Sequence, residues 1–349
     1  MRTLAAPMAM TRFAMALALL LACGDDDSTT TDGGTDPRDG APIDATTSDD
    51  DGGSSDADGG TTPTGEPTWV AVGGWGYRAA TTDGIEWTVT QGPEGADDHT
   101  PDLLRAVGYG NGWFVAVGGD RNSMVMRSRD GVSWEEDLHP AGGQWKGGVA
   151  YGAGTWVAVG GVGTVIRSTD DAATWTAVDQ RLSGAGRGIT FGGGRFVAVG
   201  DGGVIATSTD GSEWSEVDTD AGGLGSVGYG HGRYVAVGSN WNGSGFDTWC
   251  YQSTDASDWS DCPFASERYR RVFFTDGRLF VTTDEGYEHT SDGETWNHSD
   301  ASIPASAFEA EGLWVGIDGD RRYSGSSLDS LTQGDNAERG ARGFAFGAP

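Results

Sequence analysis

Four arginines recur at one position of a repeated segment, and their chemistry is that of an anion site. Arg105, Arg187, Arg270 and Arg342 each stand four residues before an aromatic residue that closes the segment, and Lys146 lies one position off the same register. Guanidinium groups that converge on one place bind carboxylates or phosphates through paired hydrogen bonds. The pattern predicts an anion-binding site. The alternative is structural, with each arginine paired to an acid of a neighbouring repeat.

Aromatic side chains in the connecting segments form a second candidate site. Beside Asn and Asp residues, such side chains suit stacking on sugar rings or contact with a protein partner. The longest connection, residues 239–249, holds two of them. The candidates are Trp75, Tyr77, Trp145, Trp241, Phe246, Tyr287 and Tyr323. The alternative is that several of them only cover the ends of structural repeats.

Other chemistries lack their signatures in this sequence. It has no HExxH segment, no pair of CxxC segments and no P-loop, so we expect no metal, no cofactor and no catalytic residue of those classes. Five scattered histidines form no ligand pattern: His99, His139, His231, His289 and His298. The formal net charge of −30 argues against nucleic acid, because binding a phosphate backbone needs a basic surface.

One phrase recurs along the chain, and its period indicates what positions these side chains. RFVAVGDGGVIATSTDGSEW at residues 195–214 has six further copies, which begin at Trp69, Trp113, Trp156, Tyr234, Leu279 and Leu313. The tryptophans that close six copies lie from 37 to 47 residues apart, a period typical of propeller blades. Sixty glycines and fourteen tryptophans favour strands and turns over helices.

Six copies contain a turn of the form Ser-x-Asp-Gly-x-x-Trp or a close variant, here called the aspartate turn. The aspartate can accept hydrogen bonds from amides of its own turn, the glycine takes a positive φ, and the tryptophan packs beneath the hairpin. An active site occurs once, whereas a structural device recurs. We therefore interpret as structural Asp83, Asp130, Asp170, Asp210, Asp255 and Asp292.

The aspartate turn resembles the Asp-box, or bacterial neuraminidase repeat, of sialidases and of photosystem II stability factor-like propellers. The resemblance covers nearly all of residues 67–349 and implies a β-propeller of that superfamily. It also implies a sialidase-like glycoside hydrolase as an alternative function. Sialidases carry an Arg-Ile-Pro motif near the first strand and a tyrosine nucleophile supported by a glutamate. Here the propeller opens Glu66-Pro67-Thr68, and nothing in the sequence pairs Tyr269 or Tyr287 with a glutamate.

The repeats predict an all-β fold, a seven-bladed β-propeller of four-stranded blades. Residues 186–217 divide into four strand-like pieces, A to D, separated by glycine-rich or Asp-Gly turns. The first copy lacks an A piece, whereas residues 341–347 form an A piece with nothing after it. We expect the C-terminal strand to pair with the N-terminal blade and close the ring. The arginines would then surround the mouth of the central channel, opposite the aspartate turns.

Two cysteines lie in the C and D pieces of the fifth copy. Cys250 and Cys262 are each six residues from Ala256, so antiparallel pairing sets them opposite each other. An exported chain enters a compartment that permits disulfides. We expect a disulfide; two buried free thiols are the alternative.

The N-terminal segments have the composition of an export signal and a tether. Residues 1–22 predict a lipoprotein signal peptide, with two arginines ahead of an apolar run too short to span a bilayer. The sequence Leu20-Leu21-Ala22-Cys23 resembles a lipobox, which implies a lipid on Cys23; an ordinary signal peptide with an incidental cysteine is the alternative. Residues 23–66 predict a disordered acidic tether, rich in Asp, Gly, Ser and Thr, ahead of the propeller at 67–349. Gly24 after the cysteine favours the bacterial outer membrane or cell surface.

The sequence thus predicts a surface-anchored, non-catalytic, monomeric propeller without a nucleic-acid partner. Its glycan or protein partner is expected on the loop face opposite the aspartate turns. The alternatives are a sialidase-like hydrolase and an envelope assembly scaffold.

Overall fold

The computed structural model describes residues 65–90, 103–120, 123–135, 143–336 and 340–348. The predicted signal peptide at 1–22, Cys23 and residues 24–64 of the predicted tether lie outside the described residues. Among the residues that are described, none forms a helix with the length and apolar character that crossing a membrane requires.

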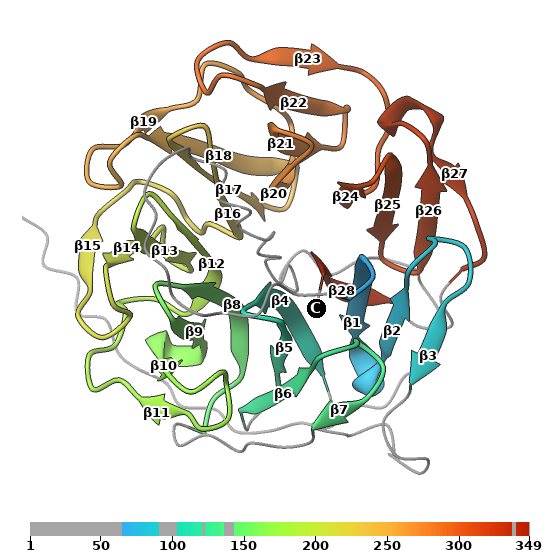
Figure 1. Cartoon of the computed structure of the whole chain (residues 1–349). Helices are drawn as coiled ribbons and strands as arrows, with labels where there is room; N and C mark the ends of the chain where they lie inside the picture. Colours follow the sequence, from blue (N-terminus) through green and yellow to red (C-terminus); the bar gives the residue numbers. More distant parts are fainter. Residues whose placement is uncertain (1–64, 91–102, 121–122, 136–142, 337–339, 349) are drawn as a thin grey trace, which may run out of the picture. The chain divides into compact units, whose positions relative to one another are not determined.

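Seven antiparallel sheets of four strands each form the blades of a ring, which confirms the predicted β-propeller (Figure 1). Strands A to D follow one another within each blade. Blade 1 consists of β28 (Ala341–Gly347), β1 (Thr68–Gly73), β2 (Arg78–Thr81) and β3 (Thr88–Thr90). Blade 2 consists of β4 (Leu104–Gly110), β5 (Trp113–Gly118), β6 (Met124–Ser128) and β7 (Trp134–Glu135). Blade 3 consists of β8 (Lys146–Gly152), β9 (Thr155–Gly160), β10 (Val165–Ser168) and β11 (Thr176–Ala177).

The remaining four blades repeat the same order. Blade 4 consists of β12 (Gly186–Gly192), β13 (Arg195–Gly200), β14 (Ile205–Ser208) and β15 (Ser215–Val217). Blade 5 consists of β16 (Ser226–Gly230), β17 (Arg233–Trp241), β18 (Phe246–Ser253) and β19 (Ser260–Asp261). Blade 6 consists of β20 (Tyr269–Thr275), β21 (Arg278–Thr283), β22 (Tyr287–Thr290) and β23 (Asn297–Ser299). Blade 7 consists of β24 (Ser306–Ala310), β25 (Leu313–Asp318), β26 (Arg321–Gly325) and β27 (Thr332–Gln333).

The two ends of the propeller meet in blade 1 (Figure 1). β28 pairs antiparallel with β1, from Thr68 opposite Gly347 to Gly73 opposite Ala341. Phe344 of β28 is fully buried, so the closing strand adds core as well as hydrogen bonds. The pairing confirms the predicted closure and covers the inner edge of β1.

The B strands show why these residues form sheets that are buried on both faces. In β13, Val197 and Val199 alternate with Ala198, and all three are fully buried. Large and small residues in alternation let neighbouring blades pack closely. One core cluster, for example, brings Val157 of blade 3 against Phe196 of blade 4. The core is therefore distributed between the blades.

The aspartate turns are closed by their own side chains, as the motif predicts. Oδ1 of Asp83 accepts hydrogen bonds from the amides of Ile85 and Glu86, each at 2.9 Å, and from the hydroxyl of Thr81. Gly84 has a φ of 70° and donates its amide to the Thr81 hydroxyl. These amides lower the pKa of Asp83, because they stabilise the charged carboxylate.

The same bonds recur in the other five aspartate turns with local variations. In blade 3 the longer turn directs the carboxylate of Asp170 to both the hydroxyl and the amide of Thr174, which hold the pKa of Asp170 at about 2. The local bonding accounts for the repetition of these aspartates without any chemistry on a substrate.

Cys250 and Cys262 form a disulfide that joins β18 to the residue after β19. Their Cα atoms lie 5.4 Å apart, and the amide of Cys262 also donates to the carbonyl of Cys250. Because β19 contributes only two residues to its sheet, the bridge strengthens the attachment of the outermost strand of blade 5.

The predicted loop at 239–249 is mostly a β-hairpin, which is a correction. β17 continues to Trp241 and β18 begins at Phe246, and these two residues pair directly. The side chain of Asn242 closes the tip, accepting hydrogen bonds from the amides of Ser244 and Gly245 at 3.0 Å. Extra strand pairing thus supports the longest connection of its kind that the described residues contain.

Candidate functional site

The four recurring arginines occupy bulges at the start of the innermost strands. In blade 2 the pairing of β4 with β5 passes from Leu104 to Ala106 and skips Arg105. The pairings in blades 4, 6 and 1 skip Arg187, Arg270 and Arg342 in the same way. A bulged residue leaves the hydrogen-bond ladder, and its side chain is turned in a new direction. All four lie at the B–C face, as we name the face of the ring with the turns between strands B and C.

Each of the first two bulged arginines is held by the residue that follows strand B of its own blade. Nε of Arg105 donates to the carbonyl of Gly119 at 3.3 Å. Arg187 makes two parallel bonds to the carboxylate of Asp201, at 2.8 and 2.9 Å. The acid thus belongs to the same blade as Arg187, whereas the structural alternative placed it in a neighbouring blade.

Lys146 departs from the predicted set, and this is a correction. It lies in the ladder opposite Gly160, so the bulge of blade 3 falls at Gly147. Lys146 is fully buried, and its Nζ donates to the carbonyl of Gln144 at 2.8 Å and to the hydroxyl of Thr164 at 3.2 Å. Burial lowers the pKa of Lys146 to about 8, and the charge of Arg181 adds to this. A buried ammonium with these partners is not part of an open anion site.

Trp145 explains why blade 3 differs. A Cβ added at Gly147 would lie 2.5 Å from the carbonyl oxygen of Gly186 and 3.1 Å from Cζ3 of Trp145, so this bulge has room only for glycine. The guanidinium carbons of Arg105 and Arg187, one from each neighbouring blade, both lie 4.9 Å from the centroid of the Trp145 ring. We call these three residues the Arg–Trp–Arg stack. With a cation from each side, Trp145 serves to hold arginines, which weakens its candidacy as a platform for a sugar.

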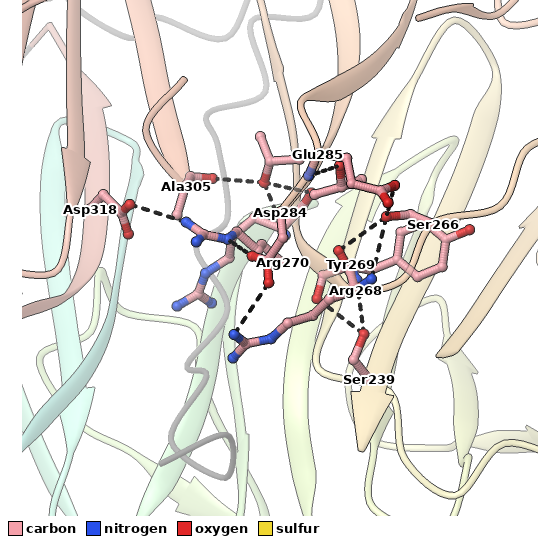
Figure 2. Close-up of polar contacts among 12 residues, drawn as sticks. Ser239, Ser266, Arg268, Tyr269, Arg270, Asp284, Glu285, Ala305 and Asp318 are labelled. Atoms are coloured by element: carbon pink, nitrogen blue, oxygen red, sulfur yellow. Dashed lines mark hydrogen bonds and ion pairs between the residues drawn. The ribbon is translucent and has the colours of Figure 1, made fainter. Parts of the chain in front are cut away.

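A second group of arginines starts in blade 6, where Arg268 and Arg270 lie beside Asp284 and Asp318 (Figure 2). Arg270 binds Asp284 of its own blade at 2.5 Å and Asp318 of blade 7 at 3.0 Å, and Arg268 approaches Asp284 at 3.5 Å. Burial alone would lower the pKa of Arg270, but the two carboxylates outweigh it and raise this pKa. For Arg270, therefore, the structural alternative of a partner in the next blade is found.

Arg271 is the unexpected member of this group. Strand A has Ala106, Gly148, Gly188 and Gly343 at the positions that match Arg271 in the register. Its Nη2 donates to the main-chain carbonyl of Arg342 at 3.2 Å, which spans from blade 6 to blade 1. Burial lowers the pKa of Arg271 to about 10; Asp318 opposes the shift and Arg342 adds to it. We call Arg268, Arg270, Arg271 and Arg342 the arginine cluster.

The arginine cluster is bounded by the long hairpin of blade 5. The guanidinium of Arg268 lies 4.6 Å from the centroid of the Phe246 ring, and Phe246 meets Trp241 edge to face at 5.2 Å. Ser239 is hydrogen bonded to both the amide and the carbonyl of Tyr269, which fixes the hairpin to the start of β20 (Figure 2). A continuous set of contacts thus leads from the exposed Trp241 through Arg268 and Asp284 to Arg270.

The predicted ligand-face aromatics are divided by burial. Tyr77 and Tyr287 are buried, which is a correction: Tyr77 packs with its hydroxyl on Arg322, and Tyr287 packs against Phe280. Both follow the turn at the start of strand C, where side chains point between blades. Three others are half-buried: Trp145, Phe246 and Tyr323. Trp75 and Trp241 are exposed, at 41% and 55%.

The described residues offer little for hydrolysis or metal binding. Burial raises the pKa of Tyr269 to about 12, and its hydroxyl donates to the carbonyl of Phe264 at 3.2 Å, so phenolate formation is disfavoured. Tyr287, the other tyrosine considered for a nucleophile, lies in the core. Within the described ranges, no three His, Cys, Asp or Glu side chains come together as metal ligands would.

Fold and site together define a β-propeller with a cationic, partly buried centre on its B–C face. No protein-family model matches the chain, and a comparison with curated proteins gave no match either. Among solved structures, the computationally designed Ika8 protein is similar at 10% identity and a TM-score of 0.51, over 80% of this chain and 91% of that one. This likeness concerns the fold alone.

Three further structures are similar at TM-scores below 0.5, so no argument rests on them. YCF48 from Cyanidioschyzon merolae matches at 17% identity and a TM-score of 0.48, over 66% of this chain and 84% of that one. A YCF48 structure bound to D1 peptide matches at 20% identity and a TM-score of 0.48, over 66% and 80%. The GH74 enzyme of Niastella koreensis matches at 17% identity and a TM-score of 0.47, over 70% of this chain and 43% of that one.

Sequence reasoning missed four residues that shape the site: Arg268, Arg271, Asp284 and Asp318. A signal existed for Arg271, because aligning the A strands places it where other blades have Ala, Gly or Ser. Nothing comparable marked Asp318, which is one of many acids in the chain and meets Arg270 only across a blade boundary.

Proposed function

We propose that this chain is a non-catalytic binding protein whose B–C face takes an acidic group of a protein partner at the arginine cluster. It is carried on the bacterial outer membrane or cell surface by a lipid on Cys23 and the tether that follows. The observation that carries the proposal is the cluster itself: Arg268 and Arg270 pair with Asp284 and Asp318, and Arg271 joins them to the backbone of Arg342, on a chain whose net charge is −30.

The charge balance of the cluster supports an acidic ligand. The guanidinium of Arg270 pairs with two carboxylates, whereas the one hydrogen bond that the described residues give the guanidinium of Arg271 goes to a neutral carbonyl. A guanidinium has five hydrogen-bond donors. Where few carboxylates accept from them, the carboxylate of a ligand can form charge-assisted hydrogen bonds with the guanidinium. The ligand would therefore approach Arg271 first.

The path of the chain supports the choice of face. β1 begins at Thr68, opposite the last residue of β28, and runs toward Gly73 beside the bulge of blade 1. The chain thus enters the propeller at the aspartate-turn side and the arginine cluster lies at the other side. A tether attached at Thr68 therefore leaves the B–C face free of its attachment point.

A glycan is the second candidate, and Trp241 is the observation that favours it. Its ring is 55% exposed and stands beside the polar Asn242 and Asp247 at the hairpin tip. Exposed indoles next to amide and carboxylate groups suit stacking on a sugar ring.

The proposal is tested by titrating the mature chain with hexaglutamate peptide and, separately, with glucuronate and sialyllactose. We expect hexaglutamate to bind, with an affinity that falls as salt is added. Its affinity for the Arg271→Gln variant should be at least tenfold lower. Arg195→Gln, which removes one arginine at the aspartate-turn side, is the matched control and should change affinity less than twofold.

Two outcomes would contradict the proposal. Equal losses in the two variants would mean that only overall charge matters, and absence of binding by all three probes would leave the cluster a structural device. Tighter binding of a sugar than of hexaglutamate, lost in Trp241→Ala, would instead establish the second candidate.

A further inference from the structure

Two tight turns on the B–C face hold bulky residues in a backbone conformation that suits glycine. Trp75, in η1 (Gly74–Gly76), has φ 62° and ψ 30°, and Val162, in η2 (Gly161–Gly163), has φ 49° and ψ 34°. For a β-branched or bulky residue this left-handed region is a genuine outlier. The sequence therefore accepts strain at both positions.

The matching turn of blade 4 shows that the strain is not required by the fold. Each of the three turns is closed by the same kind of hydrogen bond, in which the amide of residue 73, 160 or 200 donates to the carbonyl four positions later. In blade 4 the strained position is Gly202, with φ 72° and open space where a Cβ would lie. Glycine at positions 75 and 162 would relieve the strain without touching the core.

Both strained side chains are also exposed to solvent. Val162 is 61% exposed and Trp75 is 41% exposed. Trp241, at the tip of the blade 5 hairpin on the same face, is 55% exposed. These three, here called the rim residues, thus place apolar side chains on blades 1, 3 and 5 around the arginines. An exposed apolar residue held at a conformational cost is typical of a contact residue.

We propose that the rim residues are the apolar contacts of the protein partner, which meets the arginine cluster with an acidic group and the rim with apolar surface. The proposal rests on the proposed function, and it adds where the partner touches the ring. A protein is favoured because the rim residues stand on three separate blades and surround a cationic centre, so one occupant must supply both apolar and acidic groups. Rigid turns make such contacts at little entropic cost.

The test introduces the photo-cross-linking residue p-benzoylphenylalanine into the full chain, expressed in its own cells, at one position at a time. The rim positions are 75, 162 and 241, and position 285 beside the arginine cluster reports on the proposed function. Position 85 is the control, because Ile85 is 72% exposed in an aspartate turn on the other face. We expect a protein adduct of one mass from the rim positions and from 285, and none from 85.

The outcomes separate the two proposals. An adduct from position 285 alone would refute the rim residues as partner contacts and leave the proposed function standing. Equal adducts from position 85 and from the rim positions would also refute them, because cross-linking would then not be selective for the B–C face. No adduct from any position would overturn both. Independently, Val162→Gly should raise the melting temperature by about 2 °C while weakening the cross-link from 75. A lower melting temperature would refute the strain on which the inference depends.

Discussion

The Arg–Trp–Arg stack and the arginine cluster begin from the same backbone device and reach different chemistry. Both use arginines at bulges of the innermost strands. In the stack, an indole between two guanidiniums holds Arg105 and Arg187 apart, and Asp201 neutralises one of them. In the cluster, Arg270 pairs with Asp318 across a blade boundary, and the charge of Asp318 also acts on Arg271.

The difference teaches that a repeated residue need not have a repeated role. The bulge sets where each arginine starts, but its neighbours decide whether the charge is already satisfied. In the stack a carboxylate and an indole hold Arg187, whereas in the cluster the guanidinium of Arg271 donates to a main-chain carbonyl. The following predictions test this contrast, in order of decreasing effect.

Trp145→Ala should be the most damaging change at the B–C face. It removes an indole that packs on the backbone of Gly147 and Gly161 and contacts two guanidiniums. We expect a loss of about 3 kcal/mol in the free energy of unfolding, near the low end for a tryptophan because Trp145 is half-buried. Urea denaturation measures it. Trp241→Ala, in the hairpin beside the arginine cluster, is the matched control and should cost under about 0.5 kcal/mol. Similar losses in the two variants would contradict a structural role for Trp145.

Asp318→Asn should be more harmful than the corresponding change in the stack. It leaves Arg270 and Arg271 short of one carboxylate in a partly buried place, for which we expect a loss of about 2 kcal/mol. Asp201→Asn breaks a more exposed pair and should cost under about 1 kcal/mol. Thermal unfolding of both variants in low salt measures the difference. Added sulfate should restore more thermal stability to Asp318→Asn than to Asp201→Asn. Equal recovery in the two variants would contradict a difference between the arginine cluster and the Arg–Trp–Arg stack.

Lys146→Met should stabilise the protein near neutral pH, and the gain should fade at high pH. The pKa of Lys146 is lowered to about 8 in the folded chain, from an ordinary value of 10.5. The folded state therefore binds this proton less tightly, so the wild type is least stable below pH 8 and gains stability as pH rises toward 10.5.

The methionine variant lacks that gain with pH. After the loss of the two hydrogen bonds from Nζ, we expect it to be more stable than the wild type by about 1 kcal/mol at pH 7 and not at pH 10. Urea denaturation of both proteins from pH 7 to pH 10 measures this. A difference that is constant with pH would mean that Lys146 is not held in a buried, charge-disfavouring position.

The sequence was sufficient for the fold because its signals are local and repeated. Each aspartate turn closes on its own residues, as Asp83 and Thr81 do, and the alternation around Ala198 needs only the strand period. The pairing of Cys250 with Cys262 follows from their distance to one hairpin. Even ring closure is predicted by the sequence, because the first repeat lacks an A strand and the C-terminal segment supplies one.

The site was less accessible, because its residues meet across blades. Aligning the repeats found Arg187 and Arg270 but also included Lys146, since one step in register separates a bulge from a buried ladder position. Tyr77 and Tyr287 were placed on the surface because the exact end of a turn decides which way a side chain points. The strain at Val162 cannot be seen in its residue type at all.

By itself, then, the sequence determined the seven repeats, their strands and turns and the closing strand, because these depend on neighbours in the chain and on a period. Only the tertiary structure decided which arginines share an acid, which are held by Trp145, and which apolar side chains remain in water. Those outcomes depend on distances between blades, where residues as far apart as Arg271 and Arg342 come into contact.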